Sequence, residues 1–437
     1  MNKRNKFFSV VYDMRKYLLL WATQMFSGLG SGMTSFAIVI WVYEQYSSAM
    51  STAGMMVASY TPYILCSVFA GALSDRWDKK KIMLWCDVLS ALTTVIIMAL
   101  MRMNRLQLWH LYALNALSGL MNTVQQPASE VATTALLPRE HFHRVGGLRY
   151  LSGALNGILK PVLAMAVLGL WGMEAIFLFD LFTFAVAFVV LWLLIDIPKI
   201  KPAEKAKESL LRSSMKGLQW LKRTPAVLHM MLFLAAINLV ASMYDAAFPA
   251  MVLSREGGGE RVMGLVNAVI GAATLLGSLW ASAAKAPKSR VRVVCNTLLL
   301  SMATENILLA LGRSAMVWCI GGFLGWIAIP LMNANLDVLM RTNIPVEMQG
   351  RVFAARNSLQ FFTIPVGFFL GGYLVDHVFE PLMALQGKQS LLTALFGSGK
   401  GSGAACFFAF IWLMGLSIPL IFRYDKQIWR LEKEQER

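Results

Sequence analysis

The chain has 437 residues, of which 57% are hydrophobic and 15% are charged, and its formal net charge is +16 at pH 7. Soluble domains carry about a quarter charged residues, so the composition excludes a soluble protein and predicts one that crosses a membrane many times. The positive charge does not indicate a nucleic-acid partner, because the basic residues form short patches between apolar runs, as cytoplasmic loops do.

A helix needs about 20 mostly apolar residues to span a bilayer. The sequence predicts twelve such spans, six in each half. They lie at about 17–43, 51–74, 82–101, 107–130, 145–170, 173–195, 226–252, 262–284, 291–312, 315–340, 357–378 and 403–423. The segment before them, residues 1–17, lacks the features of a cleaved signal peptide.

The distribution of charge predicts the orientation and the division of the chain. Most of the 40 lysines and arginines fall in gaps that become cytoplasmic when both termini are cytoplasmic. A basic segment with two prolines, residues 196–225, separates a first bundle at 1–195 from a second at 226–437. Residues 379–402 then form an external loop whose glycines and serines predict flexibility.

The two halves carry traces of a repeat. Pro138 is followed by Arg144 and Arg149 after the fourth span, and Pro345 is followed at equal intervals by Arg351 and Arg356 after the tenth. Repeated halves around a site at the membrane midplane are common in secondary transporters. The sequence therefore predicts an all-α membrane protein with two repeated six-helix bundles.

A short charged turn, GALSDRWDKKK, joins the second and third spans. It resembles the signature loop of major facilitator superfamily transporters, although a basic cluster that only sets the membrane orientation is the alternative. The residues that carry the resemblance are Gly71, Leu73, Asp75, Arg76, Lys79 and Lys80. In that family the loop controls conformational switching, and Asp87 on the third span is expected to pair with Arg76. The resemblance also implies that Asp75 bonds the start of the eleventh span near Asn357.

Polar residues at helical spacing follow the first, fourth, seventh and tenth spans. Polar groups are costly in lipid, so they should face protein or a water-filled cavity. In the major facilitator fold these four helices line the central cavity, whereas hydrogen bonding between helices is the alternative role. The candidate cavity and substrate residues are Gln24, Ser31, Asn115, Asn122, Gln126, Asn238, Asn333 and Lys160.

Lys160 is the costliest of these residues, because it lies near the middle of the fifth span. It shares a face with Ser152 and Asn156, and Gly153 and Gly157 beside them should allow close helix approach. An ion pair with Asp245, a role in binding substrate or ion, and a side chain that reaches toward water all remain open.

The acids in the spans are the candidates for ion coupling. Asp245 on the polar face of the seventh span is the best placed, followed by Glu44 at the outer mouth and Glu305 on the ninth span. Asp180 and Glu305 lie on helices that are peripheral in this fold, where a structural hydrogen bond is the simpler role.

Further stretches resemble the drug-exporter branch of the family that includes macrolide efflux proteins and the enterobactin exporter. They are GLGSGMTSFAIVIWVYEQYSSAM, QQPASEVATTALLP, IPVEMQGRVFAARN and PVGFFLGGYLVD. Two departures bear on mechanism. The fourth span lacks the arginine that other drug–proton antiporters carry there, and Lys160-Pro161 replaces the usual glycine-proline pair.

The resemblance implies a secondary exporter of bulky amphipathic small molecules that works by alternating access and is coupled to an ion, most plausibly a proton. A flippase for lysophospholipids or lipid precursors in the same superfamily is the alternative. We expect no catalytic residues, no metal and no cofactor, since neither the histidines nor the five cysteines have the spacing of a ligand set. We expect a monomer in the cytoplasmic membrane of a bacterium.

Overall fold

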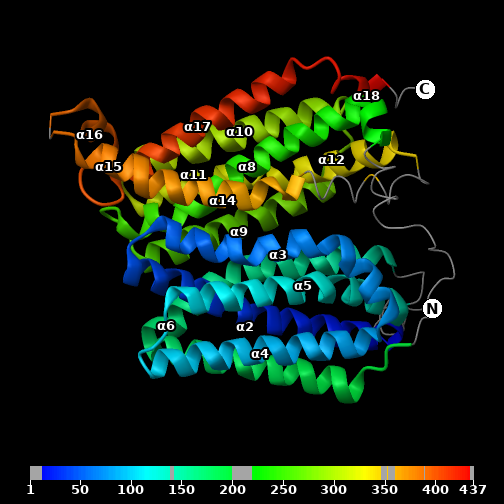
Figure 1. Cartoon of the computed structure of the whole chain (residues 1–437). Helices are drawn as coiled ribbons and strands as arrows, with labels where there is room; N and C mark the ends of the chain where they lie inside the picture. Colours follow the sequence, from blue (N-terminus) through cyan, green and yellow to red (C-terminus); the bar gives the residue numbers. More distant parts are fainter. Residues whose placement is uncertain are drawn as a thin grey trace. The chain divides into compact units, whose positions relative to one another are not determined.

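The predicted spans lie in helices of the computed structural model wherever it describes them, and it describes residues 12–137, 142–198, 219–345, 352, 360–387 and 389–433 (Figure 1). Every regular element in these ranges is helical, so the all-α fold is confirmed. Eight helical stretches among them are long and apolar enough to cross a membrane. The protein is therefore a multi-pass membrane protein.

The first half of the chain supplies five long helices. They are α2 (Arg15–Tyr46), α3 (Ala49–Arg76), α4 (Lys79–Arg102), α5 (Leu108–Leu136) and α6 (Phe142–Leu194). The last of these covers two predicted spans, because the chain turns at Gly172, whose φ of 76° suits glycine far better than other residues.

The second half begins with five helices that cover the seventh to tenth spans. They are α8 (Pro225–Ser254), α9 (Glu260–Ala283), α10 (Arg290–Leu311), α11 (Ala315–Trp326) and α12 (Ile329–Asn343). The tenth span was predicted as one run, but it is broken between α11 and α12. Pro330 explains the break, since proline has no N–H for the helical hydrogen bond and its ring crowds the preceding turn.

Shorter helices complete the second half. They are α14 (Thr363–Leu374), the π-helix η2 (Val375–Phe379), α15 (Glu380–Ala384), α16 (Leu391–Phe396), α17 (Ser402–Arg423) and α18 (Arg430–Lys433). The predicted flexible loop at 379–402 therefore contains two helical turns. Arginines hold it, because Arg313 donates to the carbonyl oxygen of Ala394 and Arg255 to that of Phe396.

The chain folds into two compact units that do not coincide with a single cut in the sequence. The first comprises Met1–Ile38 and Ala58–Ala206, and the second comprises Val39–Val57 and Lys207–Arg437. The last turns of α2 and the first turns of α3 thus pack with the second unit, while the rest of both helices packs with the first. The division at a linker over 196–225 stays a prediction, because residues 199–218 lie outside the described ranges.

The same packing device occurs in both units. Gly119 of α5 lies against the backbone carbonyl of Ser59 on α3, and Gly277 of α9 lies against that of Ile327, directly after α11. A β-carbon at either glycine would overlap the facing backbone. These pairs join the fourth span to the second and the eighth to the tenth, as expected for repeated halves.

Helix starts also correspond between the halves. Asp78 caps α4 by accepting hydrogen bonds from the backbone N–H groups of Lys80 and Lys81, at 2.9 and 3.2 Å. Ser289 caps α10 by accepting one from the N–H of Arg292 at 3.2 Å. Each cap satisfies N–H groups that have no partner inside the helix, and so fixes where the third and ninth spans begin.

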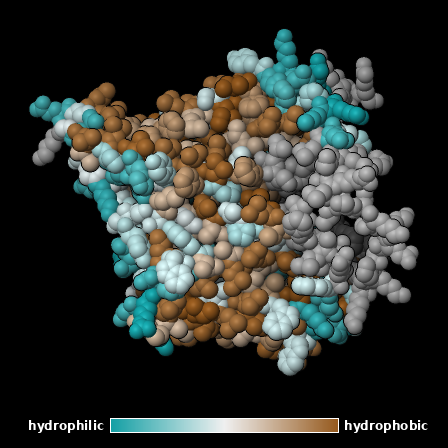
Figure 2. Space-filling model, in the orientation of Figure 1, coloured by the Kyte–Doolittle hydropathy of each residue, from teal (hydrophilic) through white to brown (hydrophobic). Residues whose placement is uncertain are grey.

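Large apolar side chains lie on the outside of the helices. Trp85, Phe182, Trp192 and Leu413 are each more than half exposed, and Figure 2 shows hydrophobic residues along the sides of the helices with hydrophilic ones toward their ends. Exposed apolar surface of this extent is expected where helices face lipid.

Candidate functional site

Lys160 and Asn156 of α6 pack against α2 at two glycines, Gly32 and Gly28, which have no side chains. A β-carbon at Gly32 would lie 2.8 Å from Cδ of Lys160, and one at Gly28 would lie 3.6 Å from Nδ2 of Asn156. The polar face of α6 therefore packs into a strip of α2 backbone, and Lys160 is half-buried. Of the two glycines predicted to allow close approach, Gly153 faces open space instead.

A second buried polar group ties three helices of the first unit together. Asp180 on α6 is 1% exposed and accepts hydrogen bonds from Ser31 and Thr34 of α2 and from Thr94 of α4, at 3.2, 2.9 and 3.0 Å. Buried polar groups need such partners. Ser31, a predicted cavity residue, thus has a hydrogen bond inside its own unit.

Asp87 lies between glutamines. It is 4% exposed, accepts a hydrogen bond from Nε2 of Gln125 at 3.0 Å, and lies beside Gln24. Its second oxygen, Oδ2, and Nε2 of Gln24 are both buried without a well-formed hydrogen bond in the structure. The pairing of Asp87 with Arg76 stays a prediction, because the Arg76 side chain lies outside the described part.

The predicted cavity residues of α5 differ in exposure. Asn115 is half-buried and donates to the carbonyl oxygen of Leu111, whereas Asn122 and Gln126 are exposed. Gln126 accepts a hydrogen bond from the hydroxyl of Tyr63 on α3 at 2.8 Å. Polar side chains thus remain accessible along a helix whose other side is buried.

The signature turn is partly described. Lys79 donates to the carbonyl oxygen of Trp77, and Lys80 donates to that of Trp192 at 2.9 Å. Lys80 also lies 3.8 Å from the Asp196 carboxylate, so the turn contacts the end of the sixth span. The side chains of three predicted switch residues lie outside the described part, namely Gly71, Asp75 and Arg76.

In the second unit, Asp245 is the one exposed residue between Ser242 and Val252, a stretch that the structure describes in full. The neighbouring predicted residues are less uniform, since Asn238 is half-buried on α8 and Asn333 is exposed on α12. An ionisable group that is accessible within a buried stretch of a transmembrane helix is a functional candidate.

Glu305 lies close to Asp245 and is buried. Oε1 of Glu305 accepts hydrogen bonds from the hydroxyl of Tyr244 at 2.7 Å and from Nε1 of Trp326 at 3.1 Å. The carboxyl group therefore holds α8, α10 and α11 together, which agrees with the structural role predicted for it.

Glu305→Leu is expected to destabilise the protein more than Glu305→Gln. Leucine leaves the Tyr244 hydroxyl and the Trp326 N–H buried without an acceptor, at about 1–3 kcal/mol each, whereas the glutamine oxygen still accepts. Thermal unfolding in detergent measures the difference. Equal losses in the two variants would contradict this role.

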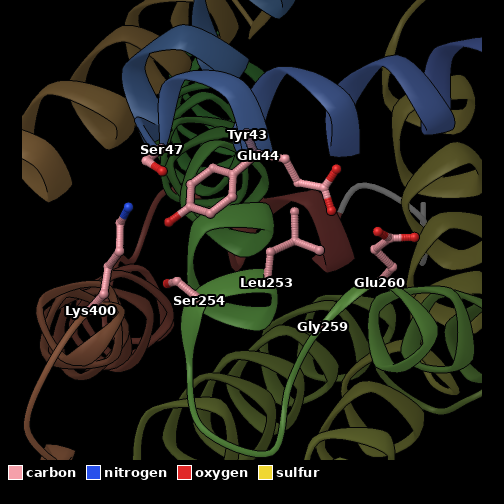
Figure 3. Close-up of a pocket in the computed structure, with 8 residues that line it drawn as sticks. All are labelled: Tyr43, Glu44, Ser47, Leu253, Ser254, Gly259, Glu260 and Lys400. Carbon is pink, nitrogen blue, oxygen red and sulfur yellow. The ribbon is translucent and has the colours of Figure 1, made fainter.

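A cavity of about 380 Å³ lies in the second unit, between the last turns of α2 and α8 and the start of α9 (Figure 3). Glu44 of α2 and Glu260 of α9 lie within hydrogen-bonding reach at one end, and Lys400 lies toward the other. Tyr43, Ser47, Leu253, Ser254 and Gly259 complete the lining. Carboxyl groups and an amine thus share a water-accessible cavity.

Lys160 and Asp245 belong to different units, so their proposed ion pair stays a prediction. If they pair, Lys160→Met leaves the Asp245 carboxylate without its partner, and adding Asp245→Asn should restore much of the lost stability. A double-mutant cycle on thermal stability should then give a coupling energy of about 1 kcal/mol or more. Strictly additive losses would exclude the pair.

Sequence reasoning missed two acids that follow α14, namely Asp376 in η2 and Glu380 in α15. Asp376 accepts hydrogen bonds from Ser48, Ala49 and Met50, and Glu380 accepts from the backbone N–H groups at the start of α17. In the sequence, only Ser48 before α3 indicates a helix cap, and it does not identify Asp376, which lies 328 residues away.

Comparison with known proteins agrees with this geometry. The family model described as Major Facilitator Superfamily matches residues 20–368. The chain is 21% identical over 367 residues to macrolide efflux protein A of Streptococcus pyogenes, covering 83% of this chain and 90% of that protein. It is 23% identical over 292 residues to the enterobactin exporter EntS of Escherichia coli, covering 64% and 66%.

Among solved structures, the nucleoside transporter NupG superposes with a TM-score of 0.63 at 14% identity, covering 94% of this chain and 100% of that one. At this identity the likeness concerns the fold. The family match spans most of the chain and includes the signature turn and the helices that carry Lys160 and Asp245. The chain therefore belongs to the Major Facilitator Superfamily and is a transport protein, not an enzyme.

Proposed function

We propose that the protein exports bulky amphipathic small molecules by alternating access and that protons drive the export. Similarity to a macrolide efflux protein and to an enterobactin exporter supports export and a large substrate. The accessible polar residues on α5, α8 and α12 suit a substrate with both polar and apolar parts.

One observation supports coupling most strongly, which is the exposure of Asp245 on α8. A coupling group must reach water or substrate and must change its charge. Glu305 and Asp180 are buried and hydrogen bonded, whereas Asp245 is accessible. We therefore assign Asp245 as the coupling acid, with Glu44 and Glu305 as the next candidates.

We further propose a monomer in the cytoplasmic membrane of a bacterium with both termini in the cytoplasm. The orientation follows from the basic residues, which gather in the turn before α4, in the segment before α10 and in the tail after α17. If successive spans alternate in direction across the membrane, these three positions lie on the same side of it.

Inverted membrane vesicles test the function. Vesicles that contain the protein should accumulate a radiolabelled macrolide when a proton gradient is imposed, and an uncoupler should stop the accumulation. A labelled lysophospholipid in place of the macrolide tests the flippase alternative. Gradient-driven accumulation of the lysophospholipid alone would contradict the proposed substrate class.

A further inference from the structure

The start of α3 is capped by a residue from the far end of the chain. The N–H groups of Ala49 and Met50 donate to Oδ1 and Oδ2 of Asp376, at 3.0 and 2.9 Å. The Ser48 hydroxyl donates to Oδ2 at 2.6 Å and accepts from the N–H of Ser51 at 3.0 Å. Three N–H groups that lack partners within α3 are thus satisfied.

This cap lies on a close helix contact. Gly372, one turn before Asp376, faces α3 so tightly that a β-carbon would lie 2.8 Å from Cα of Met50 and 2.9 Å from Cβ of Ala53. Ala53 is buried together with Ala246 of α8 and Phe368 of α14. The first two turns of α3 therefore pack on the second unit through both polar and apolar contacts.

The rest of α3 belongs to the other unit. The boundary falls between Val57 and Ala58, and α2 crosses the same boundary between Ile38 and Val39. If the outer ends of α2 and α3 move with their own helices, the bonds to Asp376 must break. The hydrogen bonds between Asp376 and α3 therefore stabilise the conformation in which they are made relative to the conformation in which they are broken.

We propose that Asp376 is a latch that holds the outer side of the transporter closed by capping α3. An anion at a helix N-terminus is stabilised by the helix dipole and by charge-assisted hydrogen bonds. A cavity of about 450 Å³ lined in part by Asp376, Glu380 and Lys400 adjoins the cap, so water can solvate the carboxylate when α3 leaves. The latch is therefore reversible.

The chain supplies a matched control in Glu380. It lies one turn after Asp376 and accepts hydrogen bonds from the N–H groups of Gly401 and Ala404 at the start of α17, at 3.1 and 3.0 Å. Burial raises the pKa of Glu380, while the backbone N–H groups lower it. Both helices of this cap lie within Lys207–Arg437, so breaking it should not release α3.

This inference rests on the alternating-access part of the proposed function, and its test needs no substrate. Spin labels at Tyr46→Cys and Leu385→Cys, both at exposed side chains, report the distance between the end of α2 and α15. The background lacks the five native cysteines, and the protein is in lipid nanodiscs. The ratio of the long-distance to the short-distance population is measured by double electron–electron resonance.

Asp376→Ala is expected to raise this ratio on the order of tenfold, which is the effect of losing a charged helix cap. Gly372→Val should raise it as well, because the side chain forces α3 away. Ser48→Ala should act in the same direction but less, and it keeps the test valid if Asp376→Ala fails to fold. Glu380→Ala should leave the ratio unchanged.

An unchanged ratio in Asp376→Ala and Ser48→Ala would overturn the latch, as would an equal rise in Glu380→Ala. The transport assay is separate from this measurement. A protein that does not transport the macrolide but responds to Asp376→Ala would refute the substrate and leave the latch intact.

Discussion

Asp245→Asn is expected to abolish accumulation of substrate against its gradient and to leave downhill exchange close to the wild-type rate. The amide resembles the protonated carboxyl group in size and charge but cannot release a proton. Helix movement and substrate binding should therefore continue, while the proton no longer drives them. Proteoliposomes with and without an imposed pH gradient measure the two activities separately.

Two conservative variants serve as controls for this experiment. Glu305→Gln keeps a side-chain oxygen that accepts hydrogen bonds from Tyr244 and Trp326. Glu44→Gln changes a residue that lines the 380 Å³ cavity of Figure 3. Both should retain accumulation. If Asp245→Asn still accumulates substrate and either Glu305→Gln or Glu44→Gln does not, the coupling acid is the residue changed in the variant that fails.

Asp75→Asn is expected to slow transport on the order of tenfold while substrate affinity stays within a few-fold. Asp75 lies in the last turn of α3, which ends at Arg76. A negative charge is unfavourable at a helix C-terminus, so an acid at this position needs a partner elsewhere. The family resemblance assigns that partner to the start of the eleventh span.

Asp78 is a matched control for Asp75. It lies three residues further on and caps α4 through Oδ1. Asparagine caps a helix about as well as aspartate, so Asp78→Asn should transport at close to the wild-type rate. Normal transport by Asp75→Asn would remove the loop from the mechanism.

The proposed contacts of Asp75 and Asp376 form a pair. An acid near the end of α3 would bond the start of the eleventh span, and an acid after α14 bonds the start of α3. If Asp75 makes its predicted contact, the two contacts would join the same two spans at opposite ends. We propose that one is made when the other is broken, which couples closure of one side to opening of the other.

The sequence predicted the fold because hydrophobic length is a sufficient signal for a membrane helix. The described part of each predicted span is helical, although α6 covers two spans and the tenth span is divided between α11 and α12, and the switch turn fell between α3 and α4. The repeat was likewise visible in the spacing of prolines and arginines, and the paired caps Asp78 and Ser289 agree with it.

The contacts between helices could not be predicted in the same way. The glycine that accommodates Lys160, Gly32, lies on α2, and helical periodicity within the fifth span does not identify it. The bond between Asp376 and α3 joins residues more than 300 positions apart. A carboxylate in an apolar segment predicts that a partner exists, but only the packing shows which one.

Proton movement driven by substrate tests the central claim most directly. Proteoliposomes with a trapped pH-sensitive dye, and with no imposed pH gradient, receive a macrolide on one side. The account predicts that substrate flux moves protons in the opposite direction, and that Asp245→Asn transports the macrolide without this pH change. Macrolide transport by the wild-type protein with no change in internal pH would contradict proton coupling.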